Sequence, residues 1–331
     1  MSKLDVTLAC GLYDRTRGLF DGTVKPEGVN LNFLPMVPGE TFWRMLNNNE
    51  FDVSELSLSS YTMLRSRCDE RFIAIPVFPS RTFRHSGIYI NTKSAIRSPG
   101  DLKGKRIGVG DYQMTAAVWV RGLLQDEYGI QPQDMNWLTG TAVQEFTLPT
   151  GITVEKFGSD NPEVLLENGE IDALISVMMP ETLKRKNSNI KRLFPDYKRV
   201  EIDYYKRTGV FPIMHTLVIK TALYEKCPWL AISLYKAFAE AKIRSYRYIY
   251  NTDALTTTLP WVVNELEDTR ELMGEDFWDY SIEGSRPTLE TLFRYLYEQG
   301  LTERHMQIEE LFVNNIKPDM SNYLHGTSED R

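Results

Sequence analysis

Short strand-like runs alternate with helical patterns along most of this chain, and this alternation constrains the fold more than any other feature. The clearest strand-like runs are residues 4–9, 51–56, 72–77 and 106–109. A helical pattern with three-and-four spacing of apolar residues follows the last of these runs and ends at Gly129. Alternation of this kind predicts α/β layers. After residue 216 the pattern becomes helical, over 228–250, 260–273, 287–298 and 302–313.

One segment occurs twice. Residues 46–53 read LNNNEFDV and residues 166–173 read LENGEIDA, with Leu, Asn, Glu and Asp at matching places. Each copy predicts a helix end, a tight turn and a buried strand, because Asn and Gly favour the left-handed conformation after a helix. Two lobes that share one local unit would produce this repeat, and so would a coincidence of common turn chemistry. The length of 331 residues also suits two lobes better than one core.

The charge balance excludes some classes of protein. The chain carries 38 Lys and Arg against 45 Asp and Glu, a net charge of −7. Binding to nucleic acid or to an anionic membrane depends on a basic footprint, so neither partner is expected. A small anionic ligand stays open, because a few local cations suffice for it. No apolar run approaches the roughly 18 residues of a membrane span.

The cysteines indicate in which cellular compartment the protein is expected. There are three, at long spacings and without a C-x-x-C pair, which favours reduced thiols in the cytoplasm. The sequence before Cys10 faintly resembles a lipoprotein cleavage site, but too few residues precede it for an apolar signal core. We therefore interpret this segment as the first strand and expect a cytoplasmic protein.

Several motifs resemble those of a known fold and family. DLKGKRIGV at 101–109 and NGEIDA at 168–173 are similar to segments of the second lobe of type II periplasmic binding proteins. FDVSELSLSSY at 51–61, FPSRTFRHS at 78–86 and FPIMH at 211–215 together resemble the 4,5-dihydroxyphthalate decarboxylase family, an enzyme branch of that fold. The resemblance spans most of residues 4–250, and the C-terminal helices add little to it.

The resemblance implies a fold and a reaction. The fold is two α/β lobes with a central ligand cleft and extra C-terminal helices, lobe 1 being 1–88 with 216–331 and lobe 2 being 89–215. The reaction removes one carboxylate of 4,5-dihydroxyphthalate as CO2 and gives protocatechuate. The partner is then a small aromatic dicarboxylate, and a homo-oligomer stays open. A solute-binding protein or sensor for an aromatic carboxylate is the alternative.

The chemistry of this reaction indicates which side chains to look for. A phenol para to the departing carboxylate pushes electron density onto the ring carbon, which an acid then protonates. Cations must hold the carboxylate that stays. Arg81 and Arg84 follow a strand and Arg15 lies in the loop after the first strand, where ligands bind in open α/β sheets. Their planar guanidinium groups suit a carboxylate, so we expect them to bind substrate.

The expected proton-transfer residues are two histidines and one carboxylate. His85 and His215 both lie where the chain is expected to cross between lobes, and histidine exchanges protons near neutral pH. Glu55 interrupts an apolar and serine-containing strand, where an unpaired buried carboxylate would be expensive. We expect these three residues to be catalytic. A hinge histidine bonded to a backbone carbonyl and a Glu–Arg ion pair are the structural alternatives.

Further polar residues are expected to line the ligand. Ser57 and Ser59 alternate with leucines and share one face, and Tyr112 and Thr115 stand near the start of a second-lobe helix, where backbone N–H groups attract anions. No metal-binding motif is present and no cofactor is predicted. A divalent ion held by His85, His215 and Glu55 stays open, because histidine with carboxylate suits several such ions.

Overall fold

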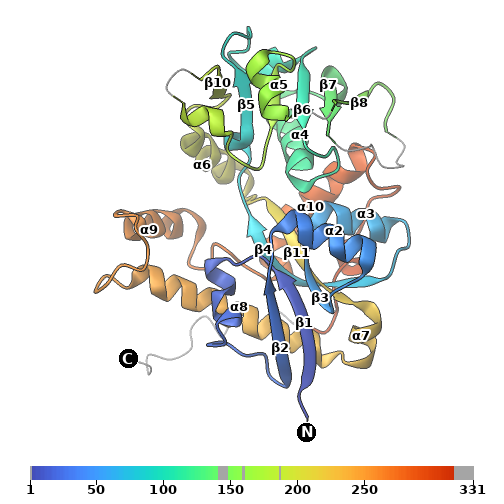
Figure 1. Cartoon of the computed structure of the whole chain (residues 1–331), viewed down its shortest axis with the longest axis vertical. Coiled ribbons are helices and arrows are strands. Elements are labelled where there is room, and N and C mark those ends of the chain that lie inside the picture. Colours follow the sequence, from blue (N-terminus) through green and yellow to red (C-terminus); the bar gives the residue numbers. More distant parts are fainter. Residues whose placement is uncertain (1, 141–147, 159–160, 186–187, 317–331) are drawn as a thin grey trace.

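The computed structural model describes residues 2–140, 148–158, 161–185 and 188–316, and it forms two lobes, each built on its own β-sheet (Figure 1). In lobe 1 the strand order is β2-β1-β3-β11-β4. These strands are β1 Leu4–Cys10, β2 Val29–Pro35, β3 Val53–Ser57, β4 Phe72–Arg81 and β11 Ile213–Lys220. In lobe 2 the order is β10-β5-β9-β6-β7-β8. These strands are β5 Ile88–Asn91, β6 Arg106–Val109, β7 Asn136–Thr139, β8 Val154–Lys156, β9 Ala173–Ile175 and β10 Ile190–Arg192.

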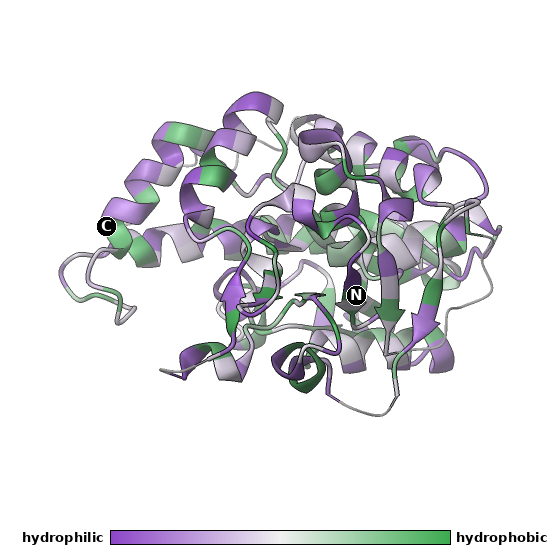
Figure 2. Cartoon of the chain, turned by 90° about the horizontal axis from the view of Figure 1, so that it is seen from above, coloured by the Kyte–Doolittle hydropathy of each residue, from purple (hydrophilic) through white to green (hydrophobic). Residues whose placement is uncertain are grey.

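Helices cover both sheets, and the predicted α/β layers are confirmed. The longer helices are α2 Pro38–Asn48, α3 Leu58–Ser66, α4 Thr115–Tyr128, α5 Pro162–Asn168, α6 Tyr197–Thr208, α8 Trp229–Tyr250, α9 Val262–Met273 and α10 Ile282–Glu298, with short α1 Arg17–Phe20 and α7 Thr221–Lys226. Figure 2 shows hydrophilic and hydrophobic residues side by side along these helices. This is the pattern of a helix that buries one face.

The repeated segment has the same structure in both lobes. The helix ends in a left-handed residue, Asn49 after α2 and Gly169 after α5, and a strand follows, β3 or β9. In each copy the aspartate accepts a hydrogen bond of 2.9 Å from a backbone N–H of the neighbouring parallel strand, Asp52 from β1 and Asp172 from β6. The two copies therefore fix equivalent strand pairs, as the two-lobe interpretation requires.

The chain crosses between the lobes twice. It leaves the lobe 1 sheet after Arg81 and enters the lobe 2 sheet at Ile88, and it returns from lobe 2 to β11 at Ile213. The predicted limits of 89–215 for lobe 2 thus include the first residues of β11, which pair with β3 and β4 of lobe 1. His215 belongs to the lobe 1 sheet, where it lies opposite Ser57 of β3.

Strand β4 continues past its predicted end at residue 77, but it bulges away from β11. His215 pairs with Ser80 and Leu217 pairs with Ile75, so β4 has extra residues between these two pairs. Pro76 and Pro79 lie in this stretch and have no N–H to give to the ladder. The carbonyls of the bulge are satisfied elsewhere: that of Phe78 accepts from the indole N–H of Trp278, at 2.8 Å.

The C-terminal segment differs from the prediction in two places. Helix α10 begins at Ile282, capped by the Ser281 hydroxyl, and Pro287 lies inside it instead of starting it. The predicted helix over 302–313 is wrong: only Ile308–Glu310 forms a 3₁₀ turn, and Phe312 then bridges to Ala74 beside β4. Backbone bonds to lobe 1 replace the bonds that a helix would have formed within itself.

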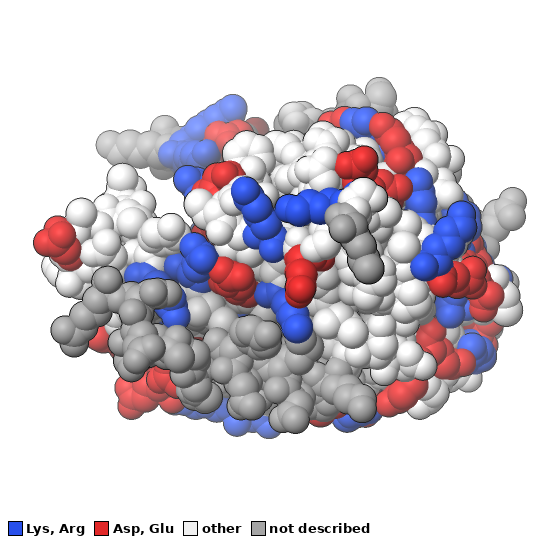
Figure 3. Space-filling model, turned by 90° about the horizontal axis from the view of Figure 1, so that it is seen from below, with Lys and Arg blue, Asp and Glu red and all other residues white. Residues whose placement is uncertain are grey.

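Charges on the lobe 1 face in Figure 3 are interspersed, with cations and anions close together. Among the described residues, no helix combines the length and the apolar character that crossing a membrane requires.

The hydroxyl of Tyr61 is the first test of this packing. It donates to the carbonyl of Leu311 at 2.5 Å and accepts from the N–H of Ala74 at 3.1 Å, all three groups being buried. Tyr61→Phe removes both bonds, so we expect the free energy of unfolding to fall by about 1–2 kcal/mol in a denaturant titration. Tyr297→Phe is the control because that side chain is exposed. Equal stability of the two variants would contradict this account of how the C-terminal segment is attached.

Candidate active site

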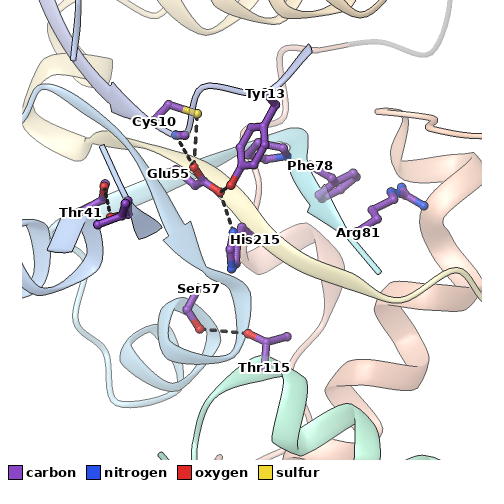
Figure 4. A network of polar contacts seen from close by, with 12 residues as sticks. Cys10, Tyr13, Thr41, Glu55, Ser57, Phe78, Arg81, Thr115 and His215 are labelled. Carbon is purple, nitrogen blue, oxygen red and sulfur yellow. Dashed lines mark hydrogen bonds and ion pairs between the residues drawn. The ribbon is translucent and has the colours of Figure 1, made fainter. Parts of the chain in front are cut away.

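Glu55 is the centre of a polar network in lobe 1. It lies on β3 with no exposed surface, yet it accepts hydrogen bonds from four donors (Figure 4). The N–H of Gly11 at 2.8 Å and the thiol of Cys10 at 3.4 Å donate to Oε2. The hydroxyl of Tyr13 at 2.8 Å and Nδ1 of His215 at 2.6 Å contact Oε1. The network therefore joins the end of β1, the middle of β3 and the start of β11.

These contacts decide the protonation of the network. Burial alone raises the pKa of Glu55, but the hydrogen bond and charge of His215, then the Gly11 N–H and the Tyr13 hydroxyl, outweigh it and leave the pKa below its ordinary value. The pKa of the Cys10 thiol is raised far above its ordinary value by burial and by the Glu55 charge. Near neutral pH Glu55 is thus an ionised acceptor, and Cys10 is a protonated donor.

His215 is oriented by this carboxylate. An ionised Glu55 accepts from Nδ1–H, so Nε2 is the nitrogen left to exchange a proton. Nε2 points away from Glu55, towards the side of the sheet where Ser57 and Thr115 lie (Figure 4). The side chain is 17% exposed, against 0% for Glu55. Phe42 packs edge-on against the ring at 4.8 Å and restricts its rotation.

Arg15 connects the Glu55 network to strand β4. Its Nε and Nη2 donate to the carbonyl of Pro79, in the bulge of β4, at 2.7 and 2.5 Å. Its guanidinium lies 4.3 Å from the ring centre of Tyr13 and 4.1 Å from that of Trp278. Arg15 thereby holds the ring whose hydroxyl contacts Glu55. Its predicted contact with substrate stays a prediction.

Arg81 contacts the C-terminal segment. It is 6% exposed, and its Nη2 donates to the carbonyl of Asp279 at 2.6 Å and to the hydroxyl of Ser285 at 2.5 Å. The Nη2 group of Arg81 therefore already makes two hydrogen bonds within the protein, and its N–H donors are not free for a substrate carboxylate. Binding of substrate by Arg81 stays a prediction. The structure also gives Arg81 a role that the sequence did not indicate, which is to bind the segment around Asp279 and Ser285.

Among Arg15, Arg81 and Arg84, Arg84 has the fewest hydrogen-bond partners in the described part of the chain. Its Nε lies 3.2 Å from the sulfur of Met214, a weak acceptor, and among the described residues no carboxylate pairs with the guanidinium. Burial lowers the pKa of Arg84 to about 10, although nearby Glu201 acts in the opposite direction. A half-buried guanidinium with unused donors, in the first crossing segment between β4 and β5, is suited to an anionic ligand.

His85 lies in a different environment from His215. It is 2% exposed, packs edge-on against Phe194 and Tyr204, and neither ring nitrogen has a hydrogen-bond partner among the described residues. Burial, helped by the charge of Arg207, lowers the pKa of His85 to about 4, so the ring is neutral near pH 7. No hydrogen bond or ring contact within the described residues joins it to His215. Its catalytic role stays a prediction.

A cluster of hydroxyl groups joins the lobes. Ser57 ends β3 and caps α3, and its hydroxyl lies 2.9 Å from that of Thr115, the first residue of α4 in lobe 2. Ser59 lies 3.0 Å from Thr115 and donates to the carbonyl of Gln113 at 2.7 Å. Ser57, Ser59 and Thr115, which the sequence predicts separately as ligand contacts, thus meet across the lobes, and their contact with the ligand stays a prediction. Tyr112 is instead buried in lobe 2 beneath the guanidinium of Arg121.

Comparison with known proteins decides the family. The chain is 39% identical over 320 residues to a protein of Comamonas testosteroni named 4,5-dihydroxyphthalate decarboxylase, covering 94% of this chain and 97% of that protein. A Pseudomonas putida protein of the same name is 37% identical over 214 residues, covering 62% of this chain and 83% of its own length. The chain belongs to the 4,5-dihydroxyphthalate decarboxylase family. The predicted family is confirmed.

The fold of this family member is that of the type II periplasmic binding proteins, as predicted. Residues 28–158 match the family described as "ABC transporter, phosphonate, periplasmic substrate-binding protein". The aliphatic sulphonate binding protein SsuA of Escherichia coli has a TM-score of 0.52 at 12% identity, covering 94% of this chain and 97% of that one. The desulfurization enzyme DSZB has a TM-score of 0.50 at 12% identity, covering 97% and 99%. At such identities only the fold is shared.

Sequence reasoning missed two members of the Glu55 network. Cys10 and Tyr13 lie more than forty positions before Glu55 in the chain. Nothing in the local sequence around Cys10 or Tyr13 links either residue to Glu55. The signal that was available is the position of both at the end of β1, where the strand-end rule applies. In the described part of the chain, no group of three His, Cys, Asp or Glu side chains has the arrangement of a metal site.

The depressed pKa of Glu55 predicts an acid-dependent stability. The folded state holds this carboxylate ionised more strongly than the unfolded chain does, so its contribution is complete above the unfolded pKa of about 4.3 and is lost as the pH falls through the folded pKa. Glu55→Gln should lower the free energy of unfolding by about 1–3 kcal/mol at pH 7. The difference from wild type should shrink below about pH 5. Denaturant titrations from about pH 2.5 to about pH 7 measure it, because the loss falls below the unfolded pKa, and a difference independent of pH over that range would refute the assignment.

Proposed function

We propose that this chain decarboxylates 4,5-dihydroxyphthalate to protocatechuate and CO2, and that His215, paired with Glu55, protonates the ring carbon. The observation that carries the proposal is the 2.6 Å contact between Nδ1 of His215 and Oε1 of a fully buried Glu55. Because this contact occupies Nδ1, the Nε2–H group of His215 is the proton donor, and it lies near the contact between the lobes. The names of the relatives from Comamonas testosteroni and Pseudomonas putida support this substrate.

The proton step can be written so that atoms balance. The phenol para to the departing carboxylate raises the electron density on the ring carbon that bears that carboxylate. Nε2–H of the His215 imidazolium gives its proton to this carbon, and the Glu55 carboxylate stabilises the imidazolium before transfer. The bond to the carboxylate then breaks, its electron pair restores the aromatic ring, and CO2 leaves. His215 takes one proton from solvent in each turnover, which is the proton that protocatechuate retains.

The retained carboxylate is assigned to Arg84. Its guanidinium is half-buried and has no carboxylate partner in the described part of the chain, and it contacts Met214, the neighbour of His215 in β11. The departing carboxylate needs weaker contacts, because tight binding in the ground state adds nothing to the rate. The hydroxyl cluster of Ser57, Ser59 and Thr115 offers such contacts, since its members already bond to one another.

The direct test is an anaerobic incubation of the full chain with 4,5-dihydroxyphthalate, with and without EDTA, in which CO2 and protocatechuate are measured. Release of both products that survives EDTA supports a proton-transfer mechanism built from the residues above. Release that EDTA abolishes and a divalent ion restores would assign Glu55 and His215 to a metal site instead. If thermal stability rises with the compound but no CO2 appears, the chain is a binding protein or sensor and the proposal fails.

Replacement of His215 should remove the proton donor. We expect His215→Asn to lower kcat by about 10²- to 10⁴-fold, because an amide keeps a polar contact with Glu55 but donates no proton to the ring. His85→Gln is the comparison. The sequence predicts a catalytic role for His85 as well, but because its ring is buried and has no hydrogen-bond partner among the described residues, we expect a much smaller effect on kcat from this variant. The melting temperature of each variant shows that it is folded. A loss of kcat in folded His85→Gln as large as in His215→Asn would make both histidines catalytic.

Replacement of Arg84 should weaken binding of the dicarboxylate. Arg84→Met keeps an apolar contact with Met214 and removes the charge, so we expect KM to rise at least tenfold, with a smaller change in kcat. Lys93→Met removes a cation from the same basic stretch of sequence and should leave KM within twofold of wild type. An unchanged KM in Arg84→Met would move the carboxylate site elsewhere, with Arg81 and Arg15 the next residues to test.

A further inference from the structure

Helices α4 and α10 form a second contact between the lobes, separate from the Glu55 network. Helix α4 follows β6 of lobe 2, whereas α10 is attached to lobe 1 through Ser285, whose hydroxyl accepts from Arg81 at the end of β4. The two helices pack directly against each other, and α4 also contacts α3 and β11 of lobe 1. In Figure 1, α10 runs from lobe 1 to the underside of lobe 2 beside α4.

Polar side chains in this contact are buried and bonded across it. Gln299, which follows α10 and is 1% exposed, accepts from Nε of Arg121 at 2.7 Å and donates to the carbonyl of Val118 at 3.1 Å. Arg121 lies on α4 with no exposed surface, and its Nη2 donates to the carbonyl of Tyr112 at 2.8 Å. Separating the helices would break both bonds of the Gln299 amide and the Nε bond of Arg121, which is costly for groups that are otherwise buried.

The backbones of the two helices also approach closely. Gly122 of α4 faces the ring of Tyr295, and a Cβ at this position would lie 2.2 Å from the ring. Trp119, one turn away, packs edge-on against the same ring at 5.7 Å, and its indole N–H donates to the carbonyl of Ile213 at 2.9 Å. The Tyr295 hydroxyl donates to Asp126 of α4 at 2.7 Å. A side chain at position 122 has no room while the helices stay in contact.

The contact fixes the part of lobe 2 that faces the active site. Thr115 at the start of α4 and Gln113 before it meet Ser57 and Ser59, and Arg121 holds the carbonyl of Tyr112 in the same loop. Helix α4 is therefore attached to lobe 1 at its N-terminus and again along its middle. Periplasmic binding proteins close around their ligands by hinge motion of the lobes. In this chain, opening of that kind would break both attachments.

We propose that α10 clamps α4 onto lobe 1, so that the lobes keep one closed arrangement with or without ligand. Gly122 and Gln299 are then positioning residues for the interlobe site. The clamp itself does not depend on the proposed decarboxylation, and only the kinetic readout below rests on it.

The radius of gyration of the full chain, measured by small-angle X-ray scattering without and with 4,5-dihydroxyphthalate, tests the clamp. For wild type we expect the same radius in both conditions. Gly122→Ala should enlarge the radius of the free chain, because the methyl group forces Tyr295 and α4 apart. Gly39→Ala is the control: that glycine also lies in a helix, with open space at its Cβ, and should leave the radius unchanged.

Steady-state kinetics distinguish a loss of positioning, which raises KM, from a loss of folded protein, which lowers only the apparent kcat. If only a fraction of Gly122→Ala molecules is closed, apparent affinity falls by that fraction, so KM should rise at least fivefold with kcat within twofold of wild type. Gln299→Ala should act in the same direction, and Gln299→Glu, which keeps the acceptor for Arg121, should recover much of the wild-type KM. If Gly122→Ala does not fold, the comparison of Gln299→Ala with Gln299→Glu tests the clamp instead.

The outcomes are distinct. A wild-type radius that falls on addition of the ligand, or a folded Gly122→Ala and Gln299→Ala with wild-type radius and KM, overturns the clamp. An enlarged radius in these variants, together with no turnover in any form of the chain, upholds the clamp and overturns the proposed function.

Discussion

Burial of an ionised carboxylate at Glu55 is the constraint on which the active-site half of this structure depends. A charge without exposed surface is costly unless donors surround it. Here a backbone N–H, a thiol, a phenol and an imidazole do so, and they come from the end of β1 and the start of β11. The same bonds that stabilise the charge also fix which nitrogen of His215 is free to exchange a proton. Stability and reactivity thus rest on one group.

Lobe 1 is arranged to support this group. The prolines of β4 interrupt its pairing with β11, and the freed carbonyl of Pro79 becomes the acceptor for Arg15. Arg15 in turn stacks on Tyr13 and on Trp278 of the C-terminal segment. A local defect in the sheet, caused by two residues without an N–H, is therefore what allows the C-terminal segment to reach the back of the site.

The C-terminal helices give this member of a binding-protein fold a different construction from a two-lobed clamshell with a free hinge. Through Gln299 and Tyr295, α10 reaches lobe 2, while its own start is bonded to Arg81 in lobe 1. An enzyme gains from such an arrangement, since reacting groups that are held in place need no reorganisation in each turnover. A transport protein needs the opposite, because it must release its ligand.

The sequence by itself determined the α/β layers, the repeated turn unit of both lobes and the family, because these follow from local patterns and from motifs that are contiguous in the chain. It also offered Glu55, His215 and His85 as candidate catalytic residues. The tertiary structure decided what long-range pairing controls. It placed Cys10 and Tyr13 on Glu55, turned Arg81 to the C-terminal segment, and laid residues 302–313 against lobe 1 instead of into a helix. A residue's polar partners depend on which strands become neighbours in the sheet, and the spacing of residues along the chain does not predict which strands these are.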